Sequence, residues 1–429
     1  TENIDQVEIV KGAASSLYGS SALNGIVNIR TGTPTAVPQT KIATSYLRYD
    51  APADTSKYWY QDSARYATMF SVVHKHKIGR LDLVANGFYF KERGFLKETF
   101  QNRYRFGLKL KYRLADKTFI GINTLYNNGD NGSFFLWENS DGRAVNPLPG
   151  SASRQNNTRY FIDPSLTSED KYGNTHRLLT RYHSIKNDND NNQSNQSKTY
   201  YGEYQFQRKL DQYELITTTG FVASQSNTDA ELFSDTTFTT KVFAYYGQLE
   251  KTIGRLNISG GLRYEYNEQN TPEQFDDITI EDGLIAEGRW IGRLGASYEY
   301  MPYSSVRASW GQGYRFPTIT ERFISTTFGI FSIVANPSLI PESGWTAELG
   351  IKQGFNVGGL RGFLDGSVFT SRYQNMMEFT FGFQGFNPTF QSDNVGNTEI
   401  TGIEVGLFGS YDIGQTTLTG FGGYTYIDP

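Results

Sequence analysis

The sequence predicts an all-β protein, a transmembrane antiparallel β-barrel. Two observations predict this fold. Apolar and polar residues alternate with a period of two over runs of ten or more residues, and the breaks between these runs are alternately short and long. A tilted strand needs about 9–11 residues to cross a bilayer. Barrels of bacterial outer membranes join their strands by short turns on one side and by long loops on the other.

The composition agrees with this class. The chain has 429 residues, a formal net charge of −4, no Cys and a mean hydropathy of −0.50. No apolar run approaches the ~20 residues of a membrane helix, which excludes helical membrane proteins. The low average fits a barrel, because lipid-facing and lumen-facing residues alternate along each strand. Without Cys there are no disulfides, thiol catalysis or Cys-based metal sites, and the near-balanced charge gives no reason to expect nucleic acid.

The run from residue 256 to residue 267 illustrates the alternation. Leu262 and Tyr264 share one face, and Arg263 and Glu265 share the other. We expect the first pair to face lipid and the second to face the lumen. A strand of a soluble sandwich also alternates but usually runs only ~5–6 residues, so the length of the runs favours a membrane barrel.

The breaks divide into two sets. The short ones are residues 76–80, 114–117, 171–174, 209–212, 253–255, 301–304, 355–359 and 412–415. The long ones are 50–63, 127–156, 185–197, 227–238, 268–287, 316–342 and 377–396. We expect the short set on the periplasmic side and the long set outside. This template gives about 17 strands. Because such barrels normally close with an even number, we expect further strands beyond the C-terminal end.

The first 35 residues have a different pattern. A short strand at 7–10, a glycine at Gly12, a helical turn at 13–18, a bend between Gly19 and Gly25, and a second strand at 26–29 follow one another. The run VEIVKGAASSLYGSSALNGIVNI resembles the closing segment of the plug domain in TonB-dependent receptors. It departs from the usual pattern at Ala13, where the family generally has Pro.

A second resemblance lies in the barrel region. Residues 314–318, Tyr-Arg-Phe-Pro-Thr, and residues 336–339, Asn-Pro-Ser-Leu, are similar to the two boxes that flank one extracellular loop in this family. The resemblance implies a 22-stranded barrel around a plugged lumen. Residues 1–35 would then be the C-terminal part of the plug, and residues 36–429 a barrel incomplete at its C-terminus. The rest of the plug and the TonB box would lie outside this chain.

The same resemblance implies a transporter in the bacterial outer membrane. Its ligand would bind outside, between loops and plug, and the TonB–ExbB–ExbD energy-coupling complex would pull on the plug to open a path. The expected partners are outer-membrane lipid, an extracellular small-molecule ligand such as a metal chelate, and, in one version, a surface lipoprotein. No catalytic residue, resident cofactor or metal site is expected. His74 and His76 share one face of a strand end, but they adjoin a short turn, which favours solvated side chains over a metal pair.

Candidate ligand-binding residues come from the long breaks, where exposed aromatic clusters indicate a binding surface. Around residues 316–342 we expect Phe323, Phe328 and Phe331 to give an apolar surface, and Arg315 and Arg322 to attract an anionic chelate. The whole candidate set is Phe134, Phe135, Trp137, Arg143, Arg315, Phe316, Arg322, Phe323, Phe328, Phe331, Phe381 and Phe383.

The substrate is open at this stage. We rank an iron–siderophore complex first, a corrinoid resembling vitamin B12 second, and a glycan taken up with a lipoprotein lid third. No His lies between residues 316 and 336, which argues against the haem ligation typical of haem receptors in this family. A passive porin would need no plug segment, and an outer-membrane enzyme would need a catalytic cluster, so both are less favoured.

Overall fold

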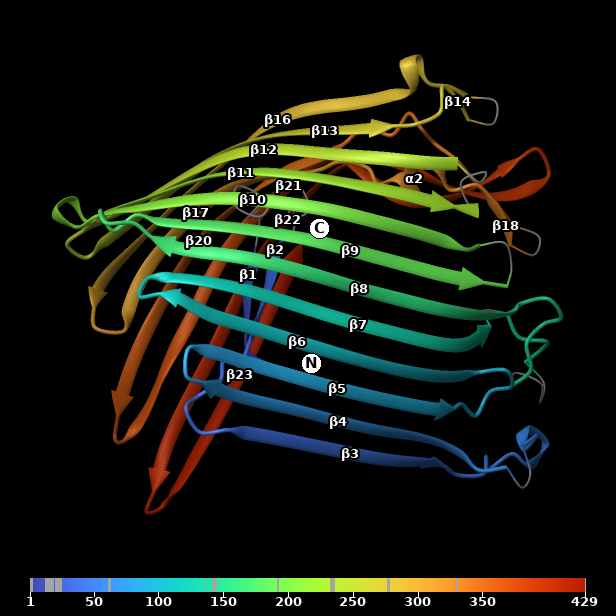
Figure 1. Cartoon of the computed structure of the whole chain (residues 1–429), viewed down its shortest axis with the longest axis horizontal. Helices are drawn as coiled ribbons and strands as arrows, with labels where there is room; N and C mark the ends of the chain where they lie inside the picture. Colours follow the sequence, from blue (N-terminus) through green and yellow to red (C-terminus); the bar gives the residue numbers. More distant parts are fainter. Residues whose placement is uncertain are drawn as a thin grey trace.

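The computed structural model describes residues 3–11, 19, 25–60, 63–134, 136–140, 145–190, 193–231, 236–275, 278–328 and 331–428. Its main feature is one curved antiparallel sheet, called the wall below (Figure 1). No helix among these residues is long and apolar enough to cross a membrane. The only helix of α type that they contain is the short α2 (Ile319–Phe323).

Seventeen long strands of the described residues build the wall, as the alternation predicts. They are β3 (Gln39–Tyr49), β4 (Arg65–Ile78), β5 (Leu81–Arg93), β6 (Phe100–Ala115), β7 (Thr118–Phe134), β8 (Ala152–Glu169), β9 (Thr175–Asn189), β10 (Asn195–Leu210), β11 (Leu215–Ala230), β12 (Thr236–Ile253), β13 (Leu256–Asn270), β16 (Leu284–Met301), β17 (Ser304–Arg315), β20 (Glu342–Val357), β21 (Leu360–Gln384), β22 (Asn387–Ile413) and β23 (Thr416–Asp428). Each pairs antiparallel with the next one in this order.

The short connections lie together at one rim of the wall, as predicted. Six of the eight breaks of the short set are two-residue turns, among them the turns at Gly79 and Gly414, where φ is +58° and +60°. Glycine adopts this backbone conformation without the steric cost that a Cβ would bring. The other two breaks are the connection 170–174 and the connection 211–214, which contains a 3-10 helix. The tight turns fix the register between neighbouring strands, so the side-chain alternation stays in phase around the wall.

The register confirms the predicted separation of the two faces. Leu262 is 52% exposed on one face, whereas Arg263 is 4% exposed on the other and forms an ion pair of 2.6 Å with Glu265. Glu348 and Glu404 lie on the same face as Arg263, and Leu349 and Val405 on the opposite face. The exposed face is a continuous band of aliphatic and aromatic side chains, as lipid contact requires.

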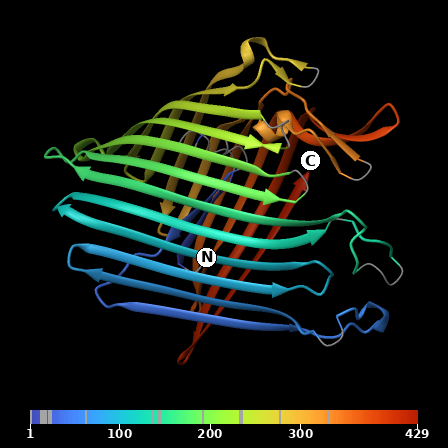
Figure 2. The same cartoon turned by 45° about the vertical axis from the view of Figure 1, so that its right-hand side comes forward.

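A separate two-stranded sheet lies inside the curve of the wall (Figures 1 and 2). It consists of β1 (Ile4–Lys11) and β2 (Gly25–Thr31). Lys75 Nζ of β4 lies 3.1 Å from the Asp5 carboxylate, and Lys109 Nζ of β6 donates to Thr31 Oγ1 at 2.9 Å. The face of the wall that carries Lys75 and Lys109 is therefore called the inner face. The predicted helical turn at 13–18 lies outside the described residues.

The predicted extent of three long loops is wrong. Strands β9 and β10 continue to within five residues of one another, as do β11 and β12, so the breaks at 185–197 and 227–238 are mostly strand. Strands β21 and β22 replace the loop 377–396 by a hairpin whose tip is residues 385–386. Polar side chains and aromatics can pair across strands without a strict apolar alternation, so the sequence pattern does not mark these strand ends.

Candidate functional site

The candidate site is built around residues 316–341, the connection from β17 to β20. Pro317 restricts the backbone before Thr318, and Thr318 caps α2: its hydroxyl accepts from the Glu321 N–H at 3.2 Å, and the Glu321 carboxylate accepts from the Thr318 N–H at 2.8 Å. This reciprocal capping box satisfies two backbone donors at the helix start. A helix of five residues is too short to be stable alone, so its position depends on the contacts described next.

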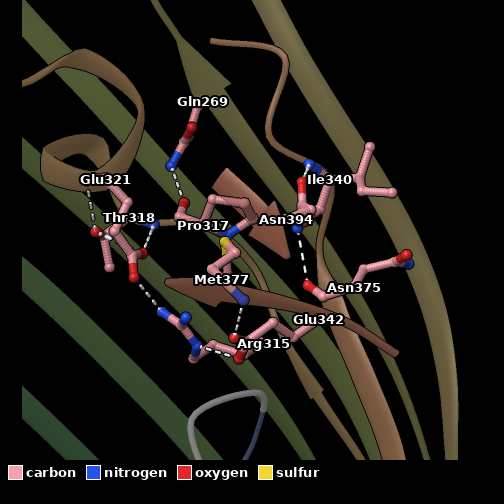
Figure 3. A network of polar contacts seen from close by, with 10 residues as sticks. All are labelled: Gln269, Arg315, Pro317, Thr318, Glu321, Ile340, Glu342, Asn375, Met377 and Asn394. Atoms are coloured by element: carbon pink, nitrogen blue, oxygen red, sulfur yellow. Dashed lines mark hydrogen bonds and ion pairs between the residues drawn. The ribbon is translucent and has the colours of Figure 1, made fainter. Parts of the chain in front are cut away.

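Two glutamates engage the guanidinium of Arg315 at the base of this connection (Figure 3). Nη1 lies 2.6 Å from Glu321, and Nε lies 2.6 Å from Glu342. The second oxygen of Glu342 accepts from the backbone N–H of Met377 on β21 at 2.6 Å. Burial alone would raise the pKa of Glu321, but hydrogen bonds from Thr318 and Arg315 outweigh it and lower that pKa. Arg315 is thus neutralised by its own neighbours.

Arg322 holds α2 against the wall from inside. It is 1% exposed, and its guanidinium donates to Gln269 Oε1 at 2.6 Å and to the Leu339 carbonyl at 2.8 Å. It also lies 4.5 Å from the ring of Phe316, a distance suited to a cation–π contact. Burial lowers the pKa of Arg322 to about 10.

Phe323 lies at the centre of a buried apolar cluster. It is 0% exposed, and its ring centroid is 4.6 Å from that of Phe238 and 5.3 Å from that of Phe275. Ile319 and Ile280 complete the cluster with Ala230. The expectation that Phe323 forms an apolar ligand-facing surface is therefore wrong. Phe323 therefore packs α2 against the ends of β11 and β12 and against the connection from β13 to β16.

The second end of the connection is tied to β22. The Asn336 amide donates to the Ser392 carbonyl at 2.9 Å and to Asp393 at 3.0 Å. The side chain of Asn394 accepts from the Ile340 N–H at 3.0 Å (Figure 3). These contacts hold the Asn-Pro-Ser-Leu box against β22.

The hairpin formed by the ends of β21 and β22 carries exposed aromatic side chains and, with Phe331 of the connection, is called the aromatic hairpin below. Two short strands, β18 (Thr326–Phe328) and β19 (Phe331–Val334), pair with each other, and β19 also pairs with β22 in parallel. Phe331 contacts Phe381 at 6.5 Å and Phe390 at 5.7 Å between ring centroids. The side chains that remain more than half exposed are Phe379, Phe381, Phe383 and Phe386. The side chain of Phe328 is outside the described part of the chain.

Trp137 belongs to a second exposed group. It is 53% exposed, and its backbone forms a bridge with Pro147 in the connection from β7 to β8. Phe134 is the half-buried last residue of β7. Phe135 and Arg143, which are also predicted here, lie outside the described residues. No contact joins Trp137 to the aromatic hairpin among the residues that the structure describes.

A cavity of about 870 Å³ opens on the inner face of β5–β9, towards the rim with the long connections. Its cationic lining is Arg103, Arg105, Arg159 and Arg181, with His183 beside them. Arg181 is paired with Asp163 at 2.7 Å. The Nε of Arg103 is buried, and no hydrogen-bond partner for it occurs among the described residues. This arginine-lined cavity carries more positive than negative charge and was not predicted from the sequence.

The structure thus divides the predicted residues by role. Arg315, Phe316, Arg322 and Phe323 are support for the connection, and Phe331, Phe381 and Phe383 form one surface. Sequence reasoning missed Glu321, Glu342 and Gln269. The T-x-x-E spacing of Thr318 and Glu321 is a capping signal that could have been recognised, whereas the partners of Arg322 become neighbours only through the fold. No group of three or more potential metal ligands occurs within the described ranges.

Comparison with known families gives one match over most of the chain. The profile described as "TonB dependent receptor-like, beta-barrel" matches residues 29–429. Among curated proteins, the hemoglobin and hemoglobin-haptoglobin-binding protein A of Haemophilus influenzae is 28% identical over 121 residues. That match covers 26% of this chain and only 11% of the length of the relative.

Solved structures share the fold at low sequence identity. The siderophore receptor PirA from Pseudomonas aeruginosa has a TM-score of 0.76 at 16% identity, covering 99% of this chain and 73% of that one. The FrpB iron transporter from Neisseria meningitidis has a TM-score of 0.72 at 14% identity, covering 99% and 68%. The hemophore receptor HasR of Serratia marcescens has a TM-score of 0.74 at 13% identity, covering 100% and 70%.

Proposed function

Because this chain belongs to the TonB-dependent receptor-like β-barrel family, we propose that it imports a scarce, bulky solute across the bacterial outer membrane. The proposed cargo is an iron–siderophore complex. The wall would span the membrane many times, with its apolar outer face towards lipid. The tight turns would lie in the periplasm and the connection 316–341 at the cell surface.

The observation that carries this proposal is the small sheet inside the wall. Asp5 and Thr31, which are neighbours at one end of this sheet, are held by Lys75 and Lys109 of the inner face. We propose that residues 1–35 are the end of a plug and residues 36–429 the barrel around it. A passive porin keeps a water-filled lumen, so an ordered segment held at the inner face favours a gated transporter.

Two surfaces support an anionic, aromatic chelate as cargo. The aromatic hairpin offers apolar rings to stack on, and the arginine-lined cavity offers guanidinium groups, which suit carboxylate and catecholate oxygens. Arg315 and Arg322 cannot supply this charge, because both are engaged by neighbours. We therefore assign Phe331, Phe381 and Phe383, with Trp137, to ligand contact, and the buried members of the predicted set to holding the loop.

The proposed work cycle needs no covalent chemistry in this chain. Ligand binding outside would be followed by a pull on the plug from the TonB–ExbB–ExbD complex, and the solute would pass along the polar inner face. A corrinoid and a glycan with a lipoprotein lid stay as alternatives. Neither needs the excess of guanidinium groups that the arginine-lined cavity provides.

The test is identification of the cargo. The protein would be purified from its native membrane under iron limitation, and bound small molecules would be identified by mass spectrometry. Recovery of an anionic iron chelate, with growth on that chelate lost when either the protein or TonB is removed, is expected. Recovery of a corrinoid, a glycan or haem would replace the proposed cargo, and growth independent of TonB would contradict the transport mechanism.

A further inference from the structure

The outer face of β3–β6 carries an unusual group of charges near the rim with the long connections. Arg48, Tyr66 and Arg93 lie directly opposite one another on three neighbouring strands. Lys91 lies one pleat below, in the row of Tyr46 and Thr68. All three cations therefore point away from the inner sheet, towards the surroundings of the barrel.

No acid balances these cations on their own face. The outer faces of β3, β4, β5 and β6 lie wholly within the described residues and carry no Asp or Glu. Elsewhere on the outer face near the same rim, four cations are each paired with an acid. The pairs are Arg154 with Asp130 at 2.8 Å, Lys186 with Asp188 at 2.8 Å, Lys241 with Glu268 at 2.9 Å and Arg372 with Glu399 at 3.1 Å.

The surroundings of the three cations fit an interface between lipid tails and headgroups. Tyr46 stacks on Tyr66 with ring centroids 6.1 Å apart, and Arg93 lies 5.8 Å from the Tyr66 ring. Tyrosines collect at the level of the headgroups in membrane proteins. Below them, Ile42 and Phe70 continue the exposed apolar band towards the middle of the membrane.

We propose that Arg48, Lys91 and Arg93 form a binding site for the phosphate groups of an outer-leaflet lipid. Arginine presents paired N–H donors that match phosphate geometry. With strands about 4.8 Å apart, the two guanidinium stems stand about 10 Å apart, which lets one headgroup bridge them. The site rests on the outward orientation of the apolar face under the proposed function, but not on the identity of the cargo.

The test compares two lipids that differ by one phosphate. The native protein in detergent would be titrated with diphosphoryl lipid A and with monophosphoryl lipid A, and retained lipid measured by native mass spectrometry. We expect preference for the diphosphoryl form. The double variant R48Q/R93Q should bind that form at least tenfold more weakly, because each basic side chain near an anionic surface contributes measurably.

The matched control removes two positive charges from the inner face of the next strand. Lys111 and Arg113 lie on β6 and face inward, so K111Q/R113Q should leave lipid binding unchanged, and R48K/R93K should restore part of it. Equal binding of the two lipids by the native protein, an unaffected R48Q/R93Q variant, or an equal loss in the inner-face control would each overturn the site. Iron-chelate uptake is measured separately, so failure here leaves the transport proposal testable on its own.

Discussion

Arg322 donates a hydrogen bond of 2.6 Å to the side-chain oxygen of Gln269, and both residues are buried. Gln269 is near the end of β13, on the same inner face as the ion-paired Arg263 and Glu265. The Gln269 amide also donates to the Pro317 carbonyl at 2.8 Å. One side chain of the wall therefore fixes both the start of the loop and its helix.

Arg322→Met should loosen the loop while leaving the wall intact. The substitution removes the donors to Gln269 and Leu339, and a buried polar group left without a partner costs about 1–3 kcal/mol. Limited proteolysis should cut residues 316–341 faster than in the native protein, whereas heat-induced unfolding of the barrel should occur at the same temperature. Arg372→Gln, at an exposed ion pair, is the control and should not alter cleavage.

Substitution of the buried Phe323 and substitution of the phenylalanines of the aromatic hairpin should have opposite effects on loop stability and on uptake. Phe323→Ala removes a fully buried ring, for which about 3–5 kcal/mol is typical, so it should destabilise the loop as Arg322→Met does. The triple variant F331S/F381S/F383S should keep the loop resistant to protease but lower chelate uptake at least tenfold. Normal uptake by the triple variant would place ligand contact elsewhere.

The capping contacts of Glu321 predict a dependence of the loop on pH. The folded pKa of Glu321 is lowered from 4.5, so the stabilisation is present above pH 4.5 and is lost as the pH falls through the folded pKa. Protease sensitivity of residues 316–341, assayed with an acid-active protease, should rise in that acidic window. Glu321→Gln should be sensitive at neutral pH already and show a flatter profile; a native loop equally protected at all pH values would contradict this.

Orientation can be tested with single cysteines, because the chain has none. Phe386→Cys, at the exposed hairpin tip, should react with a membrane-impermeant maleimide on intact cells. Asp116→Cys, in the tight turn between β6 and β7, should react only after the outer membrane is opened. Reversed reactivity would invert the assignment of the two rims.

A charge on the outer face should impair assembly. Leu262→Arg places a cation towards lipid, at a cost of about 2–4 kcal/mol near the bilayer midplane. Ser259→Arg, on the same strand but lining an inner cavity of about 800 Å³ opposite Glu250, should assemble normally. The folded fraction would be measured from the difference in gel mobility between unheated and heated samples. Arg263→Leu is a poor control, because it leaves the buried Glu265 without its partner.

The alternation of residue types predicted the strands, their faces and the tight turns, because lipid on one side and a polar interior on the other impose it directly. It failed towards the rim with the long connections. Around Asn187 and Asn227 the strands continue with polar side chains on both faces, and at Phe381 with aromatics, so no period marks where they end.

The candidate site was predictable only where its contacts are local, as in the capping box of Thr318 and Glu321. The contacts of Asn336 with Ser392 and Asp393 are distant in sequence. The burial of Phe323 depends on Phe238 and Phe275, which are 85 and 48 positions away in sequence, and the pairing of Arg322 depends on Gln269. Side chains that are exposed by sequence pattern can be enclosed once distant connections fold over them.

The contacts of Glu342 have a consequence for how this surface can change during evolution. Because Arg315 and the Met377 backbone meet at that one carboxylate, the pairing of β17 with β20 is secured below the segment 324–335. Shortening, lengthening or exchanging residues 324–335 would leave the underlying strands in register. A barrel built in this way can change one surface connection while its strand pairing is conserved.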